Sequence, residues 1–263
     1  MVADPEVTPF WSYFRVDGYS TGTENSAFDG LMSASAIHRQ LSGKKPRFGR
    51  SGLGWNPAGT SCRMGCNVVA TFPIDPAHTA VLSMDCQTGI VSIYTKDDKD
   101  AFLTRAASLL SHGRASGMTV IHVQVGFRPG LPEVSSRNVL FGAVKSSAQH
   151  QKLFQEPLGA IPAVIAPKEG EIVITKHRVS AFTGTDLTMI LRANDIDTLV
   201  LFGIATSGVV LSTLLEAADA DFRLAVIKDC CADLDTNLHD CLVNRLFPSR
   251  ASVLSAREFV EAP

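Results

Sequence analysis

Residues 198–220 read TLVLFGIATSGVVLSTLLEAADA, and this stretch decides the fold. Its first five residues are an apolar run, which is typical of a strand buried on both faces. After a glycine-containing turn, residues 207–220 place Val210, Leu214 and Ala217 on one stripe with the period of a helix. A buried strand that passes directly into an amphipathic helix predicts one strand–helix unit of an α/β protein.

The same alternation of strands and helices continues on both sides of this unit. The predicted strands are short apolar runs, and the predicted helices repeat their apolar residues every three or four positions. Strands are expected at 80–84, 118–125, 172–174, 224–227 and 252–254, and helices at 101–115, around 187–191 and at 239–246. Because parallel strands need a crossover, usually a helix, this order predicts a three-layer α-β-α sandwich around a mostly parallel sheet of five or six strands.

Length, composition and charge narrow the class of protein. The 263 residues suffice for one large α/β domain, and 45% hydrophobic with 19% charged residues is typical of a globular core. A formal net charge of −2 gives no electrostatic reason to expect nucleic acid or an anionic membrane as a partner. No apolar run is long enough to span a bilayer, so we also expect no membrane partner.

The N-terminal part of the chain differs from the rest. Residues 1–73 are rich in Gly, Ser, Thr and Asn without apolar periodicity, which predicts a partly irregular extension before a domain at 74–263. The N-terminus lacks the apolar core of a secretory signal, and the few cysteines indicate free thiols, so we expect a soluble, cytoplasmic protein. Cys62 and Cys66 lack a second pair at zinc-site spacing, so we predict neither a metal nor another cofactor.

Three polar features follow predicted strands. Asp85 and Gln87 come after the first strand, Lys176 after the third, and residues 203–213 lead from the fourth strand into its helix. The carboxyl ends of parallel strands share one edge of the sheet, where ligands bind in such folds. A carboxylate, an ammonium group and a helix N-terminus together can hold an anion or a developing oxyanion. The sequence therefore predicts a functional site at this edge.

These features carry a family resemblance. The chain has DxQ at 85–87, K-x-x-x-S-A-F-x-G-T-x-L from Lys176 to Leu187, and G-x-A-T-x-x-x-V-x-x-T from Gly203 to Thr213. In order and spacing these motifs resemble the isochorismatase-like (cysteine) hydrolases over roughly residues 76–256. The resemblance implies the fold predicted above, a small-molecule substrate, a homo-oligomer and a cis peptide between residues 204 and 205.

One position departs from the family pattern. In most members of the family that this chain resembles, an Asp–Lys–Cys triad hydrolyses amides. The residues at the matching positions of this chain are Asp85, Lys176 and Val209. Valine cannot act as a nucleophile. Members that hydrolyse vinyl ethers need no cysteine: a carboxylic acid protonates the enol carbon and water adds to the cation. The resemblance thus implies that Asp85 is the acid or base and that Lys176 tunes it and binds a substrate carboxylate.

The resemblance also implies a pocket around these groups. The N–H groups of Ala205 and Val209 are expected to face it as oxyanion donors. Gln87 and Thr206 are expected in the same pocket, and Arg128 and Phe182 are candidate substrate contacts.

Neighbouring residues are poor substitutes for the missing cysteine. Thr206 and Ser207 lie near the helix start, where a shift of two positions turns a side chain to another direction, and Ser207 fits better as a helix cap. Cys86 follows Asp85 directly, and adjacent strand residues point to opposite faces.

Two classes of function remain open. The first is a hydrolase that acts on a vinyl ether or a C–N bond through Asp85 and Lys176. The alternative is a catalytically inactive family member that serves as a binding or scaffold protein. The retention of Asp85 and Lys176 favours the first, because a buried charge pair is costly to desolvate.

Overall fold

The computed structural model describes residues 72–261. The predicted extension at 1–73 lies outside the described residues except for its last two, and so do Cys62 and Cys66. No helix among the described residues is long and apolar enough to cross a membrane.

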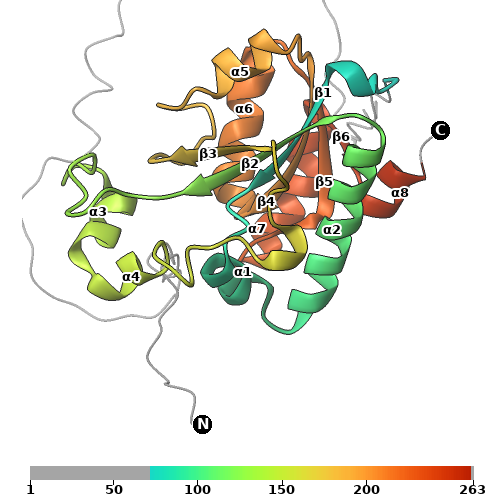
Figure 1. Ribbon diagram of the computed structural model, residues 1–263. Helices are drawn as coiled ribbons and strands as arrows, with labels where there is room; N and C mark the ends of the chain where they lie inside the picture. The colour runs from blue at the N-terminus through green and yellow to red at the C-terminus, as the bar shows by residue number, and fades with distance from the viewer. Residues whose placement is uncertain (1–71, 262–263) are drawn as a thin grey trace, which may run out of the picture. The chain divides into compact units, whose positions relative to one another are not determined.

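A six-stranded parallel sheet forms the centre of the domain, in the order β3-β2-β1-β4-β5-β6 (Figure 1). The first and fourth strands are buried along their whole length, as the apolar runs predicted. The three-layer parallel fold expected from the sequence is confirmed. The strands are β1 (Thr79–Met84), β2 (Thr119–Val125), β3 (Ile172–Lys176), β4 (Thr198–Ile204), β5 (Arg223–Ala232) and β6 (Ser252–Leu254).

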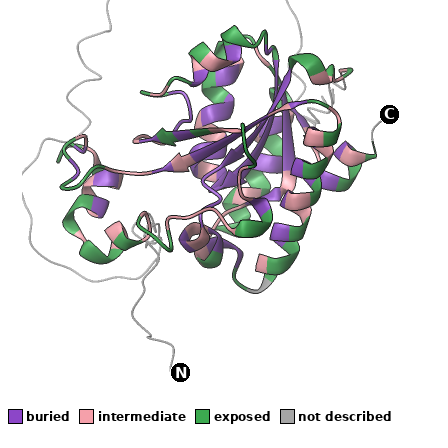
Figure 2. Cartoon of the chain, viewed as in Figure 1, coloured by how far each residue is buried: buried purple, intermediate pink, exposed green. Residues whose placement is uncertain are grey.

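Helices cover both faces of the sheet (Figure 1). From β1 the chain crosses to β2 on one side of the sheet's centre, and from β4 it crosses to β5 on the other side. Because both crossovers are right-handed, the helix between β1 and β2 lies on one face of the sheet and the helix between β4 and β5 lies on the opposite face. Helix residues on the side toward the sheet are mostly buried, whereas residues on the outer sides of the helices are mostly exposed (Figure 2). The α-helices are α1 (Thr88–Thr95), α2 (Lys99–Ala115), α3 (Val139–Ser146), α4 (Ala148–Lys152), α5 (Leu187–Ala193), α6 (Leu211–Asp219), α7 (Thr236–Cys241) and α8 (Ala256–Val260).

Short helical turns connect several of these elements. Four are 3-10 turns, at Pro76–His78, Lys96–Asp98, Ala163–Ile165 and Phe247–Ser249. Two more are π-helical, at Thr206–Val210 and Leu242–Leu246. The predicted helix at 207–220 therefore begins as a π-helical turn and becomes regular only at Leu211. The strand predicted at 224–227 extends to Ala232.

The strand order reverses between β1 and β4, which lie side by side in the middle of the sheet. From β1 the chain continues to β2, and from β4 it continues to β5 on the opposite side. Loops leaving two such strands diverge, so the carboxyl edge opens into a crevice at this point. Asp85 follows β1 and Ala205 follows β4, so the fold positions both at this crevice.

Candidate active site

Asp85 and Lys176 form a buried ion pair at the carboxyl edge of the sheet. The Lys176 Nζ lies 2.8 Å from Asp85 Oδ2, with side-chain exposures of 2% and 8%. Lys176 is the last residue of β3 and reaches past β2 to the end of β1. Its Nζ also donates a hydrogen bond to the Arg178 carbonyl oxygen over 3.0 Å. The two groups predicted to meet at this edge are therefore in direct contact.

The environment of Asp85 shifts its protonation equilibrium toward the acid. Burial raises the pKa of this carboxyl group, and the charge and hydrogen bond of Lys176 lower it only in part, so the pKa lies above its ordinary value. Asp85 Oδ2 faces Lys176, whereas Oδ1 is buried and has no hydrogen-bond partner among the described residues. A carboxyl group with a raised pKa and one unused oxygen is suited to proton transfer.

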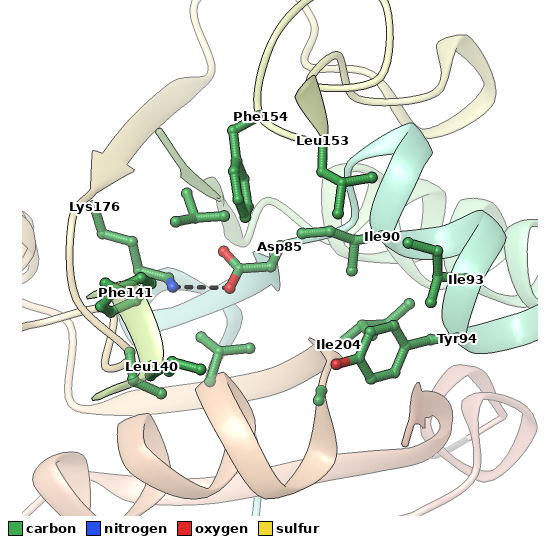
Figure 3. Close-up of a pocket in the computed structure, with 14 residues that line it drawn as sticks. Asp85, Ile90, Ile93, Tyr94, Leu140, Phe141, Leu153, Phe154, Lys176 and Ile204 are labelled. Carbon is green, nitrogen blue, oxygen red and sulfur yellow. Dashed lines mark ion pairs between the residues drawn. The ribbon is translucent and has the colours of Figure 1, made fainter. Parts of the chain in front are cut away.

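A pocket opens beside this pair (Figure 3). The space between its walls is about 620 Å³, including the part that is open to solvent. The polar side chains in its lining are those of Asp85, Lys176 and Tyr94. The remaining lining residues are apolar: Ile90, Ile93, Val125, Leu140, Phe141, Leu153, Phe154, Val179, Ile204, Ala205 and Val209.

The segment between β2 and β3 supplies one wall of the pocket. Leu140 and Phe141 belong to α3, and Leu153 and Phe154 follow α4. The Phe127 ring packs edge-on against both Phe141 and Phe154, with centroid distances of 5.5 and 5.3 Å. This aromatic contact fixes α3 relative to the end of α4. No helix was predicted between the strands at 118–125 and 172–174, so the sequence did not indicate this wall.

The loop after β4 supplies the opposite wall. The Ile204–Ala205 peptide is cis, as the resemblance implied, and Val209 is 2% exposed at the pocket. Ser207 does not cap the helix. The N-cap is Ala205, and the Ser207 N–H donates to Asp233 Oδ2 over 2.8 Å. A carboxylate from the loop after β5 thus holds this turn in place.

Four residues expected at the pocket or the substrate lie elsewhere. Gln87 donates to the Val125 and Gly159 carbonyl oxygens and accepts from the Val125 N–H, so it joins β2 to the loop before β3. Thr206 Oγ1 pairs with His239 Nδ1 at 2.8 Å. Phe182 packs in the main core, and the Arg128 side chain is 66% exposed. None of the four lines the pocket.

A model of the isochorismatase domain matches residues 79–258 of the chain. The chain belongs to the isochorismatase family. The isochorismatase family protein YecD of Escherichia coli O157:H7, itself uncharacterised, is 32% identical over 188 residues, covering 70% of this chain and 95% of that protein. Maleamate amidohydrolase of Pseudomonas putida is 31% identical over 140 residues, covering 53% of this chain and 64% of that protein.

Solved structures agree with this assignment. An isochorismatase family protein from Burkholderia thailandensis superposes with a TM-score of 0.61 at 27% identity, covering 70% of this chain and 94% of that one. N-carbamoylsarcosine amidase from Thermoplasma acidophilum gives a TM-score of 0.54 at 26% identity, covering 68% and 96%. The site thus sits in a family of hydrolases, some of which are named for amide substrates.

Thiols are absent from the pocket of this isochorismatase-family chain. Its lining, which consists of described residues, contains no Cys, Ser or Thr. Cys86, Cys230 and Cys231 are free and buried, and burial is the main cause that raises the pKa of Cys86 and of Cys231 to about 12. Thiols so protonated are poor nucleophiles. Within the described part of the chain, no group of three His, Cys, Asp or Glu residues is arranged to hold a metal ion.

Tyr94 is a polar pocket residue that was not predicted from the sequence. Its hydroxyl is buried without a hydrogen-bond partner among the described residues, and burial, followed by the charges of Asp233 and Asp85, raises its pKa. Ile90, Ile93 and Tyr94 follow the spacing i, i+3, i+4, so helical periodicity after β1 could have indicated this face. The phenol is a neutral donor at ordinary pH.

Proposed function

We propose that this protein hydrolyses a small molecule, at a vinyl ether or a C–N bond, with water as the nucleophile. Asp85 acts as acid and base, and Lys176 supports it. The observation that carries the proposal is the unpartnered Asp85 Oδ1 in a pocket lined by no thiol and no aliphatic hydroxyl. Val209, which the family resemblance matches to the nucleophilic cysteine, lies in the wall of this pocket.

For a vinyl ether, the protonated Asp85 donates its proton to the terminal enol carbon. The C=C electron pair forms the new C–H bond and leaves an oxocarbenium ion centred on the oxygen-bearing carbon. Water adds to this oxygen-bearing carbon and returns a proton to the Asp85 carboxylate, and the hemiketal then collapses to a ketone and an alcohol. The raised pKa of Asp85 supports this cycle, because the group needs both protonation states near neutral pH.

For a C–N bond, the Asp85 carboxylate takes a proton from water as the oxygen attacks the carbonyl carbon. The same proton then passes to the leaving nitrogen, so the products are a carboxylic acid and an amine. We propose that the N–H groups of Ala205 and Val209 stabilise the intermediate oxyanion. The names of the amidase relatives support this branch.

The proposal extends to the protein as a whole. We infer that residues 74–263 form the hydrolase domain and residues 1–73 an extension, and that the protein works in the cytoplasm as a homo-oligomer. The family resemblance is the support for the oligomer.

The test is turnover of isochorismate, nicotinamide and N-carbamoyl compounds by purified protein. Asp85→Asn keeps the size of the side chain, and asparagine tolerates the backbone φ of 54°. Activity should fall by on the order of 10²–10⁴ at a temperature where circular dichroism shows that the variant, destabilised by its unpaired Lys176, is still folded. The matched control is Asp186→Asn, at an exposed helix start where the side chain makes no capping bond. Vinyl ether hydrolysis in D₂O should place one deuterium on the product carbon.

Iodoacetamide distinguishes water from a thiol as the nucleophile. Activity should survive this reagent, since the described cysteines lie outside the pocket lining. If the wild type hydrolyses neither a vinyl ether nor a C–N bond, the proposal of a hydrolase is replaced by that of a binding protein.

A further inference from the structure

We infer that the pocket selects a neutral, largely apolar ligand that carries one hydrogen-bond donor beside one acceptor, and that it rejects carboxylates. As a statement about the substrate, this rests on the proposed function; as a statement about binding, it stands alone. It departs from the sequence-based expectation that Lys176 holds a substrate carboxylate.

The cation in the pocket is already paired. Lys176 Nζ contacts Asp85 Oδ2 at 2.8 Å and the Arg178 carbonyl oxygen at 3.0 Å. Lys176 is the single Lys or Arg in the lining, all of which is described. A carboxylate that takes Lys176 must therefore displace Asp85 and leave a second buried anion unpaired.

Nearby cations are directed to other partners. Arg178 donates to the carbonyl oxygens of His177 and Glu133, at 2.6 and 2.9 Å. Lys145 donates to the carbonyl oxygens of Leu131 and Val134, at 2.9 and 3.1 Å. These contacts hold together the segment that forms the pocket wall, so the cations are not available without loosening that wall.

The ion pair offers an anionic ligand no net attraction. When both groups are ionised, the charges of Asp85 and Lys176 offset each other, so a ligand carboxylate gains no net positive charge in exchange for its lost hydration. At least about a tenfold preference for a neutral ligand over its carboxylate analogue is therefore expected.

The two unused polar atoms define what a ligand should offer. Asp85 Oδ1 accepts and the Tyr94 hydroxyl donates, and both are buried without a partner among the described residues. Both residues line the same pocket, with Tyr94 opposite the Phe154 wall (Figure 3). A primary amide has an N–H for the carboxylate and a carbonyl oxygen for the phenol. Such a ligand relieves two unsatisfied buried groups at once.

The walls define the ligand's body. Ile90, Ile93 and Leu153 are aliphatic, and Phe141 and Phe154 present aromatic rings (Figure 3). Walls of this kind favour a ligand whose body is a single aromatic ring or a branched aliphatic group. The ligand class is therefore a neutral, ring-sized amide or a molecule with the same pairing of donor and acceptor.

Calorimetry with the full-length protein tests this at pH 7.5, using benzamide and benzoate, which share a shape and differ in charge. Benzamide should bind at least tenfold more tightly. Tyr94→Phe should weaken benzamide severalfold to tenfold and leave benzoate unchanged. Leu140→Arg places a cation at the pocket and should reverse the preference, whereas Val139→Arg, on the same helix at a residue that is 78% exposed, should not.

The inference would be overturned if the two probes bound equally, if benzoate bound more tightly, or if benzamide did not bind at millimolar concentration. It would also be overturned if Tyr94→Phe bound benzamide as tightly as the wild type. Selective benzamide binding without turnover of any compound would leave the inference standing and defeat the proposed hydrolase. Faster turnover of isochorismate than of neutral compounds would do the reverse.

Discussion

Breaking the Asp85–Lys176 pair from one side should destabilise the fold far more than breaking a surface pair. At 2.8 Å and an effective dielectric constant of about 20, the attraction is about 6 kcal/mol, most of which offsets the cost of burying two charges. Lys176→Met leaves the buried Asp85 without its cationic partner. We expect this variant to lose about 3–5 kcal/mol of unfolding free energy, or roughly 6–20 °C in the thermal midpoint.

The double variant separates the pair energy from the desolvation cost. Asp85→Asn alone leaves a buried ammonium group, whereas Asp85→Asn with Lys176→Met leaves no buried charge. The double variant should therefore be at least about 2 kcal/mol more stable than the sum of the single losses predicts, and this difference is the coupling energy of a double-mutant cycle.

The matched control is a double-mutant cycle on the exposed pair Arg223–Asp197. These two side chains are also in contact, at 2.7 Å, but they are 58% and 53% exposed. Their coupling energy should be below about 1 kcal/mol.

Urea unfolding at pH 7 measures all four proteins of each cycle. Acidification gives a second readout in Lys176→Met. Burial raises the folded pKa of Asp85 above the ordinary value of 3.8, and removal of Lys176 raises it further. The penalty from an acid with a raised folded pKa is full above that pKa and disappears as the pH falls through it toward 3.8. The defect of Lys176→Met should thus shrink in acid. Additive losses at pH 7, or a defect that grows on acidification, would refute the reasoning.

Three further outcomes are expected. Burial opposes ionisation of Glu171, but hydrogen bonds from Arg114 and from the Lys168 N–H outweigh it and lower the pKa from 4.5 to about 2. Glu171→Gln should then cost about 1–2 kcal/mol at pH 7 after allowance for solvent screening, and the difference from wild type in urea unfolding should fade between about pH 4.5 and 2. Val209→Cys places a thiol at the pocket, and this thiol should form an acyl adduct with 4-nitrophenyl acetate. Peptide mass spectrometry should map the adduct to residue 209, and labelling of the same peptide in the wild type would contradict this prediction. Truncation at about residue 74 should lower the thermal midpoint by less than about 4 °C, because residues 1–73 lack the apolar periodicity of a core segment, and a larger fall would show that the segment is integral.

The strands and the charge pair could be predicted because they depend on local pattern. β1 and β4 are apolar without alternation, since both of their faces are covered, and the sequence shows this directly. Parallel strands align their carboxyl ends, so Asp85 and Lys176 had to lie at one edge. The wall from α3 and α4 could not be predicted in this way. Its helices are 8 and 5 residues long, and their packing depends on Phe127 from outside them.

The sequence by itself determined the α/β class, the parallel sheet and the edge of the sheet at which Asp85 and Lys176 meet. The tertiary structure decided which polar groups face the pocket. Gln87 and Arg128 are as polar as Tyr94, yet Gln87 bonds to backbone and Arg128 lies at the surface. The physical reason is that residue type and spacing fix the chemistry and the strand end, whereas a side chain's direction depends on the packing of segments distant in sequence.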